Sequence, residues 1–163
     1  LDRPTSGIVL YARTSKALTR MNEQFREKQV QKTYWAVVDN APPNPSGTLE
    51  NYLQKNQKQN KSFVTKGAEG KHAVLDFKLI KKLDNFFHLE IKPKTGRHHQ
   101  IRVQLANIGC IIKGDLKYGA RRSNKDASIH LLAQKLEFIH PVKKEPITIV
   151  APAPKDSIWE ACS

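Results

Sequence analysis

The segment Thr95–Arg102, with the sequence TGRHHQIR, constrains the fold more than any other part of the chain. A stretch of β-type residues precedes it and a helical apolar period follows it, so Gly96 marks the junction between a strand and a helix. The apolar positions of that helix and the glycine that ends it are Ile101, Leu105, Ile108 and Gly109. Because arginine and histidine have little use in a core, the junction predicts an anion-binding surface.

The net charge of the chain indicates which anion this surface binds. The 163 residues include 28 Lys and Arg against 15 Asp and Glu, a formal net charge of +13. Such an excess attracts the phosphate backbone of a nucleic acid, with an affinity that falls steeply with salt. A plain basic surface or a ribosome-associated scaffold has the same charge, so charge alone leaves these alternatives open.

Length and cysteine content limit the class of protein. A chain of this size fits one domain with a sizeable core. Cys110 and Cys162 stand far apart and outside any metal-ligand spacing, which predicts reduced thiols and no structural zinc. No apolar run approaches the ~20 residues of a membrane span, and we expect no signal peptide. We expect a cytoplasmic protein, a monomer by default, without a bound metal or a membrane partner.

The remaining pattern predicts an α+β fold with a mixed, mostly antiparallel sheet and a few flanking helices. A helix follows an N-cap at Thr14 or Ser15, and the residues expected on its buried face are Leu18, Met21, Asn22 and Phe25. Strands are expected at residues 7–12, 32–39, 72–83, 86–92, 129–139 and 146–150. Asp84-Asn85 is a tight-turn signal between two of them. Residues 53–62 have little to bury and are expected as an exposed loop or a weak edge strand.

Asp2 is the first candidate for chemistry. Its neighbours Arg3, Thr5 and Ser6 offer a cation and hydroxyl donors, which keep a carboxylate ionised and able to act as a nucleophile or a base. An aspartate that only organises a turn before a strand is the plainer alternative.

Arg97 and Arg102 bracket the start of the later helix, where guanidinium groups and free backbone N–H groups suit phosphate or carboxylate. A pair of surface arginines is the plainer alternative. We expect the rings of His98 and His99 to point apart, which makes them poor joint metal ligands.

Aromatic residues form the third group. Tyr34 and Trp35 alternate on a strand, so they face opposite sides of the sheet. Aromatic rings beside cations stack on exposed bases, although core packing explains them equally well. His130 and His140 are expected to be hydrogen-bonded structural residues.

Together, four segments resemble the RluA-type pseudouridine synthases, which isomerise uridine in ribosomal or transfer RNA. In the family's order they are LDRPTSG (1–7), KTYWAVV (32–38), TGRHHQIRVQLANIGCIIKGDLKYG (95–119) and LEFIHP (136–141). The resemblance reaches from residue 1 to about residue 151. It implies the fold of a pseudouridine synthase catalytic domain, with residues 1–163 as a single domain.

The resemblance also implies residue roles. Asp2 matches the catalytic aspartate, Arg102 the basic residue that pairs with it, and Tyr34 the tyrosine that lies against the target base and is a candidate general base. The residues expected to bind the substrate are Ile101, Arg3, Arg97 and His99. The family carries His-Arg directly before Leu-Asp, with further strands ahead of it. Here these would precede Leu1, so we expect a catalytic domain that lacks its N-terminal part.

The implied reaction needs no redox cofactor, metal or nucleotide energy source, because uridine and pseudouridine are isomers. The expected partner is structured RNA, with ribosomal RNA ahead of transfer RNA. A non-catalytic RNA-binding module explains the charge and the aromatic residues, but it has no need of Asp2 together with Tyr34 and Arg102. An RNA hydrolase is weaker still, since the sequence has no carboxylate cluster for a metal pair.

Overall fold

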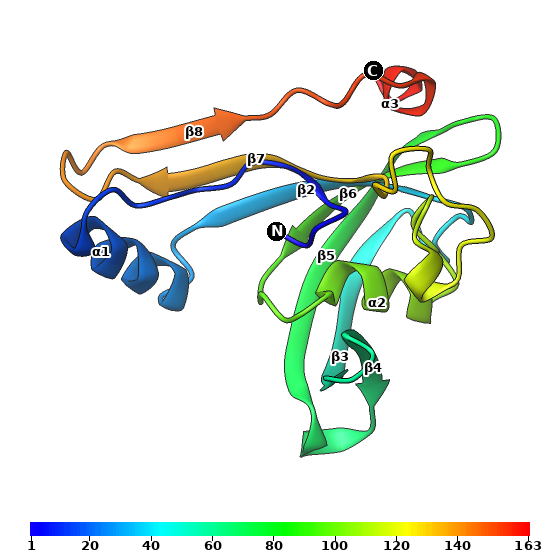
Figure 1. Ribbon diagram of the computed structural model, residues 1–163, viewed down its shortest axis with the longest axis horizontal. Coiled ribbons are helices and arrows are strands. Elements are labelled where there is room, and N and C mark those ends of the chain that lie inside the picture. The colour runs from blue at the N-terminus through cyan, green and yellow to red at the C-terminus, as the bar shows by residue number, and fades with distance from the viewer.

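The computed structural model describes residues 1–163 except for the side chain of Ala68. One eight-stranded sheet runs in the order β1-β7-β2-β6-β5-β3-β4, and β8 pairs with β7 beside β1 (Figure 1). The strands are β1 Ser6–Gly7, β2 Gln31–Val38, β3 Ser46–Asn56, β4 Lys61–Thr65, β5 Lys71–Lys82, β6 Phe87–Pro93, β7 Leu131–Ile139 and β8 Pro146–Val150. The α-helices are α1 Ser15–Arg26, α2 Gln100–Asn107 and α3 Ser157–Ala161, and the 3₁₀ turns are η1 Gly67–Glu69 and η2 Leu116–Tyr118.

Apart from the short parallel pair β1–β7, the strand pairs are antiparallel, which confirms the predicted α+β class. The sheet twists strongly, so that β7 and β8 run across the view in Figure 1 while β3 and β5 run down it. The hairpin β5–β6 turns at Asp84-Asn85 as expected, with Leu83 N donating to Phe86 O at 2.8 Å.

The core lies on both faces of the sheet. One face packs against α2 and buries Leu75, Leu89 and Leu105, while the other buries Val37 and Leu132 under α3. Alternation along β2 puts Tyr34 on the α2 face and Trp35 on the α3 face, as predicted. The sheet face that carries α2 is therefore also the face that presents Tyr34.

Helix α1 begins after the predicted N-cap Thr14, and Met21 is buried as predicted, but the rest of the predicted buried face was wrong. Leu18 and Phe25 are 51% and 41% exposed, Asn22 is exposed too, and Gln24 is buried in their place. The side-chain amide of Gln24 donates to Ile139 O at 2.7 Å and accepts from Ile139 N at 3.0 Å. These two hydrogen bonds to the end of β7 select the face of α1, which leaves Phe25 beside Lys32 of β2.

Two further expectations are corrected. The strand predicted at residues 7–12 ends at Gly7, because β8 occupies the edge of β7 from Lys135 onward. Residues 53–62 belong to the hairpin β3–β4 rather than to an exposed loop, and Leu53 is buried with Val103 and Tyr118. The alternative of an edge strand for this segment holds, since β4 is the outermost strand on that side.

Of the helices in the described chain, none is long and apolar enough to cross a bilayer.

His88 on β6 is a buried histidine that the structure leaves without a polar partner. The residue is 1% exposed, its ring meets Trp35 edge-on, and neither ring nitrogen has a hydrogen-bond partner in the described part of the chain. Burial, with a smaller contribution from Lys81, lowers its pKa to about 4. The folded protein therefore holds His88 neutral well below the pH at which an unfolded histidine takes up a proton.

His88 is expected to make the protein less stable in acid. Between pH 6.5 and pH 4 the unfolded chain binds a proton at this position and the folded chain does not, so the free energy of unfolding falls by about 2–3 kcal/mol. Urea unfolding at pH 7 and pH 4.5 should show a smaller acid loss in His88→Leu than in the unaltered protein. Equal losses in the two proteins would contradict the assignment, because the other histidines contribute identically to both.

Candidate active site

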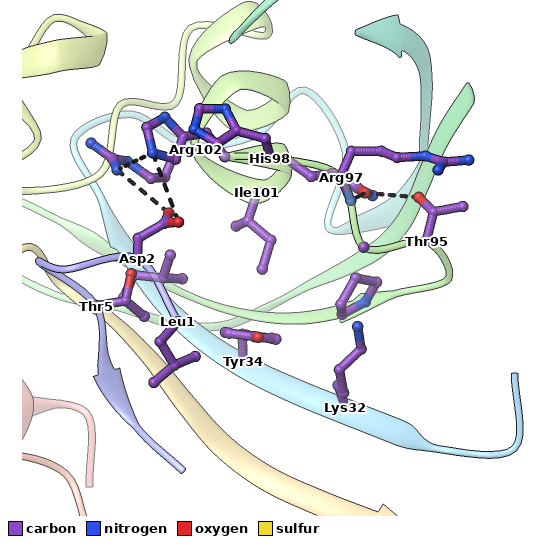
Figure 2. Close-up of a pocket in the computed structure, with 15 residues that line it drawn as sticks. Leu1, Asp2, Thr5, Lys32, Tyr34, Thr95, Arg97, His98, Ile101 and Arg102 are labelled. Atoms are coloured by element: carbon purple, nitrogen blue, oxygen red, sulfur yellow. Dashed lines mark hydrogen bonds and ion pairs between the residues drawn. The ribbon is translucent and has the colours of Figure 1, made fainter. Parts of the chain in front are cut away.

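A cleft of about 360 Å³ lies on the α2 face of the sheet, where the chain start, β2 and the β6–α2 loop meet (Figure 2). It brings together residues that are far apart in the sequence. Its lining includes Leu1, Asp2, Thr5, Lys32, Tyr34, Thr95, Gly96, Arg97, His98, His99, Ile101, Arg102 and Leu131. Of the seven predicted site residues, all but Arg3 line this cleft.

Local backbone structure positions Asp2. A turn closes behind it, in which Thr5 N donates to Asp2 O at 3.0 Å, and β1 then pairs with β7. Gly7 has φ +118°, and a Cβ there would lie 2.3 Å from Ala133 O. Only glycine allows this close approach, which fixes the start of the chain over the cleft.

Arg3 does not join the cleft. In the turn of residues 2–5 its side chain diverges from that of Asp2 and lies exposed beside Asp126 and Ser128 at a different cavity. The expected cation beside Asp2 is instead Arg102, whose Nη1 lies 3.4 Å from Asp2 Oδ2. The two residues are 100 positions apart in the sequence.

Arg102 has a stronger partner that sequence reasoning missed. Its Nε and Nη2 donate to the two oxygens of Asp115 at 2.8 and 2.7 Å. Arg102 is 5% exposed and Asp115 is 1% exposed, so the bidentate pair is buried, and the Arg102 guanidinium also lies 5.0 Å over the Tyr118 ring. In the sequence, the one indication that Asp115 belongs to the site was its position after Gly114 in the segment 95–119.

His99 is held neutral by its neighbours. Its Nε2 lies 3.2 Å from Arg102 Nη1, and because arginine can only donate, Nε2 must accept. The ring proton is then on Nδ1 and is donated to Tyr118 Oη at 2.8 Å. Burial and the positive charge of Arg102 lower the pKa of His99 to about 4, although Asp2 opposes the shift. A neutral ring fits a position beside a guanidinium.

His98 stacks on His99, with ring centroids 3.7 Å apart and planes at 24°, so the expectation that the two rings point apart was wrong. The left-handed backbone of His99, at φ +52°, turns its side chain back beside its neighbour. His98 Nε2 donates to Asn60 Oδ1 at 3.1 Å, so its Nδ1 accepts from Ser62 Oγ at 2.7 Å. Burial lowers its pKa as well, and two neutral rings stack without repulsion.

Tyr34 and Ile101 form the apolar side of the cleft. Figure 2 shows the Ile101 side chain directed at the Tyr34 ring, with Asp2 and Arg102 to the left of Ile101. Burial, and then the charge of Asp2, raises the pKa of Tyr34. Its hydroxyl is therefore protonated at neutral pH and is a donor rather than a ready proton acceptor.

Arg97 lies at the rim, on the opposite side of the cleft from Asp2 (Figure 2). Its backbone N–H donates to the Gln100 side chain at 3.0 Å, and its Nε donates to His72 O at 2.8 Å. The exposed guanidinium is thereby held at the mouth of the cleft.

His130 and His140 are hydrogen-bonded, as expected. His130 Nε2 lies 2.9 Å from Asp156 Oδ2, and His140 Nδ1 accepts from the backbone of Val142 and Lys143. Among the described residues, no three His, Cys, Asp or Glu side chains are grouped as metal ligands.

Comparison with known proteins defines the class to which this site belongs. Residues 1–107 match the sequence profile of the RNA pseudouridylate synthase family, and the chain belongs to that family. The solved structure of human RNA pseudouridylate synthase domain containing 4 shares the fold, with a TM-score of 0.79 at 22% identity over 99% of this chain and 72% of that one.

Two bacterial relatives are more similar in sequence. An uncharacterised RNA pseudouridine synthase of Chlorobaculum parvum is 35% identical over 171 residues, which cover 93% of this chain and 52% of the relative. Ribosomal large subunit pseudouridine synthase C of Buchnera aphidicola is 36% identical over 160 residues, covering 93% of this chain and 51% of the relative. The chain thus spans about half the length of these two relatives.

Loss of the buried carboxylate at position 115 is expected to be costly. Asp115→Asn removes the bidentate counter-charge of the buried Arg102 guanidinium and leaves only the longer contact with Asp2, which should lower the free energy of unfolding by roughly 3 kcal/mol. Asp76→Asn is the matched control, because Asp76 pairs with Lys94 at 3.5 Å while 41% exposed, and surface pairs contribute about 1 kcal/mol or less. Urea unfolding measures both variants, and equal losses would refute a special role for the Arg102–Asp115 pair.

Proposed function

We propose that this protein isomerises uridine to pseudouridine in structured RNA, with Asp2, Tyr34 and Arg102 as catalytic residues. The observation that carries the proposal is the position of Asp2, whose carboxylate lies 3.4 Å from the buried Arg102 guanidinium in a cleft that Tyr34 also lines. A carboxylate held beside a fixed cation is oriented in the cleft, as a nucleophile requires. Membership of the RNA pseudouridylate synthase family supports this assignment.

The target uridine has to leave its stack before Asp2 can reach it, at a cost of a few kcal/mol. We propose that the uracil ring lies against Tyr34, with Ile101 on the apolar side of the cleft. The glycosidic carbon–nitrogen bond then breaks, the uracil turns, and a carbon–carbon bond forms between the sugar and carbon 5 of the base. Carbon 5 loses its proton, and the ring nitrogen released from the sugar gains one, so atoms balance without an added reactant.

Tyr34 is assigned to stacking and proton donation in this scheme. A general base has to accept a proton near the working pH, whereas burial raises the pKa of this phenol. Asp2 is then the anionic group of the cleft, and Arg102 keeps its charge directed at the substrate. His99 acts as a neutral neighbour of Arg102 that contacts the substrate without adding charge.

The RNA partner follows from charge and from the relatives. A formal net charge of +13 suits a polyanion, and one of the relatives is named as a ribosomal large subunit synthase. We infer that ribosomal RNA is the substrate, with transfer RNA as the second candidate, and that the protein works as a monomer in the cytoplasm. Residues 1–163 would serve as one catalytic domain.

Asp2→Asn tests the chemistry directly. The variant should bind RNA with unchanged affinity and form pseudouridine more slowly by roughly a hundredfold or more, because the amide has neither the charge nor the nucleophilicity of the carboxylate. Tritium release from RNA labelled at carbon 5 of uridine measures turnover, and Asp84→Asn in the β5–β6 turn is the matched control. Tritium release by Asp2→Asn at the control rate would exclude the proposed role.

Three further measurements on the reacted RNA distinguish the alternative functions. Chemical tagging of pseudouridine detects the isomerisation, strand breaks would indicate a hydrolase, and binding with neither product would indicate a non-catalytic RNA-binding module. Mapping of pseudouridine in total RNA with and without the protein would identify the modified uridine.

A further inference from the structure

Lys32 is a half-buried cation without a counter-charge. It lies two residues before Tyr34 on β2, and Figure 2 shows its amine directed toward the β6–α2 loop, away from Asp2. No carboxylate of the described residues lies within ion-pairing distance of its Nζ. Burial lowers the pKa of Lys32. A charge that is desolvated and unpaired costs free energy, which an anionic ligand would offset.

Lys32 also belongs to a second cavity that adjoins the cleft. This cavity has a volume of about 480 Å³ and lies between α1, the end of β6 and the β6–α2 loop. Its lining has four cations and no carboxylate among the described residues, and the cations are Lys28, Lys32, Lys94 and Arg97. Of these, Lys94 alone has a carboxylate partner, Asp76. The cavity is therefore suited to an anion.

The wall contributed by α1 is aromatic. Phe25 lines the cavity with its ring 6.0 Å from Lys32 Nζ, and the residue is 41% exposed. The core does not need this ring, because α1 docks through Met21 and Gln24. An exposed aromatic ring beside a cation is the arrangement on which an unpaired base stacks while its phosphate is neutralised.

The β6–α2 loop also lines this cavity, and it can contact a ligand through Gly96 and Arg97. Gly96 has no side chain, and a Cβ there would lie 3.4 Å from Lys32 Nζ. The Nε of Arg97 is occupied by His72 O, while its two terminal nitrogens have no hydrogen-bond partner among the described residues. These nitrogens can bind two phosphate oxygens at once.

We propose that this second cavity binds the nucleotide next to the target uridine, with its phosphate on Lys32 and Arg97 and its base against Phe25. The inference rests on the proposed function, since it takes the target base to lie on Tyr34. Lys32 and Tyr34 occupy the same face of β2 two residues apart, a separation of ~7 Å along the strand. A uridine stacked on Tyr34 therefore has its neighbouring phosphate within reach of Lys32.

Salt dependence of binding to a short oligouridylate tests the phosphate contact. Lys32→Gln should reduce the slope of log affinity against log NaCl concentration by about 0.7, the value for one single-strand phosphate contact, and Lys32→Arg should retain the slope. Lys82→Gln is the matched control, because Lys82 lies at the opposite end of the β5–β6 hairpin from Lys94. An unchanged slope in Lys32→Gln, or an equal loss in Lys82→Gln, overturns the proposal.

Two further measurements separate binding from folding. Thermal unfolding of Lys32→Gln should occur at an unchanged or higher temperature, because the substitution removes an unpaired half-buried charge. Arg97→Gln alters an exposed side chain and should also lower the salt slope, whatever the effect of Lys32→Gln on folding. Phe25→Ala should weaken oligouridylate binding roughly tenfold without changing the slope, since stacking carries no charge.

The outcomes also separate this proposal from the proposed function. Altered salt slopes in a protein that releases no tritium would support the subsite and refute isomerisation. Normal tritium release with an unaltered slope in Lys32→Gln would refute the subsite alone. If both proposals hold, Lys32→Gln should raise KM for RNA several-fold and leave kcat close to that of the unaltered protein.

Discussion

The buried pair of Arg102 and Asp115 is the interaction on which the cleft depends. A guanidinium that is 5% exposed needs a fixed counter-charge, and two hydrogen bonds to one carboxylate supply it. The third side of the guanidinium faces Asp2 and His99. Asp115, which does not line the cleft, thus orients Arg102. The guanidinium is therefore already directed at Asp2 before any ligand binds.

Burial, together with the same guanidinium, lowers the pKa of His99. The guanidinium makes His99 an acceptor, and the proton on the other side of that ring goes to Tyr118. His98, stacked on His99, accepts a hydrogen bond from Ser62 on the β3–β4 hairpin, and burial lowers its pKa. The hairpin therefore affects the electrostatics of the cleft, although none of the three proposed catalytic residues lies on it. Positive charge is left to Arg102, Arg97 and Lys32, which are distributed from one end of the cleft to the other.

Sequence patterns predicted the local elements well where a turn signal or a regular alternation of side chains marked them. The strand-to-helix junction at Gly96, the β5–β6 hairpin and the alternation of Tyr34 and Trp35 all follow from short-range rules. The meeting of Asp2 and Arg102 came from the resemblance to a family, since no local rule relates positions so distant. The face of α1 was mispredicted because a polar contact of Gln24 outweighed the apolar period of Leu18 and Phe25. Asp115 was missed because burial of a carboxylate leaves no periodic signal.

The placement of Tyr34 and Lys32 on a single central strand has a mechanical consequence. Strand β2 is paired with β7 at both residues and with β6 from Tyr34 onward, so the two side chains cannot move apart or together without breaking the sheet. In the proposed binding mode, this spacing would set a fixed distance between the target uridine and the phosphate beside it. The sugar–phosphate chain would have to fit that distance, so a flexible, unpaired run of nucleotides would bind where a stiff duplex would not.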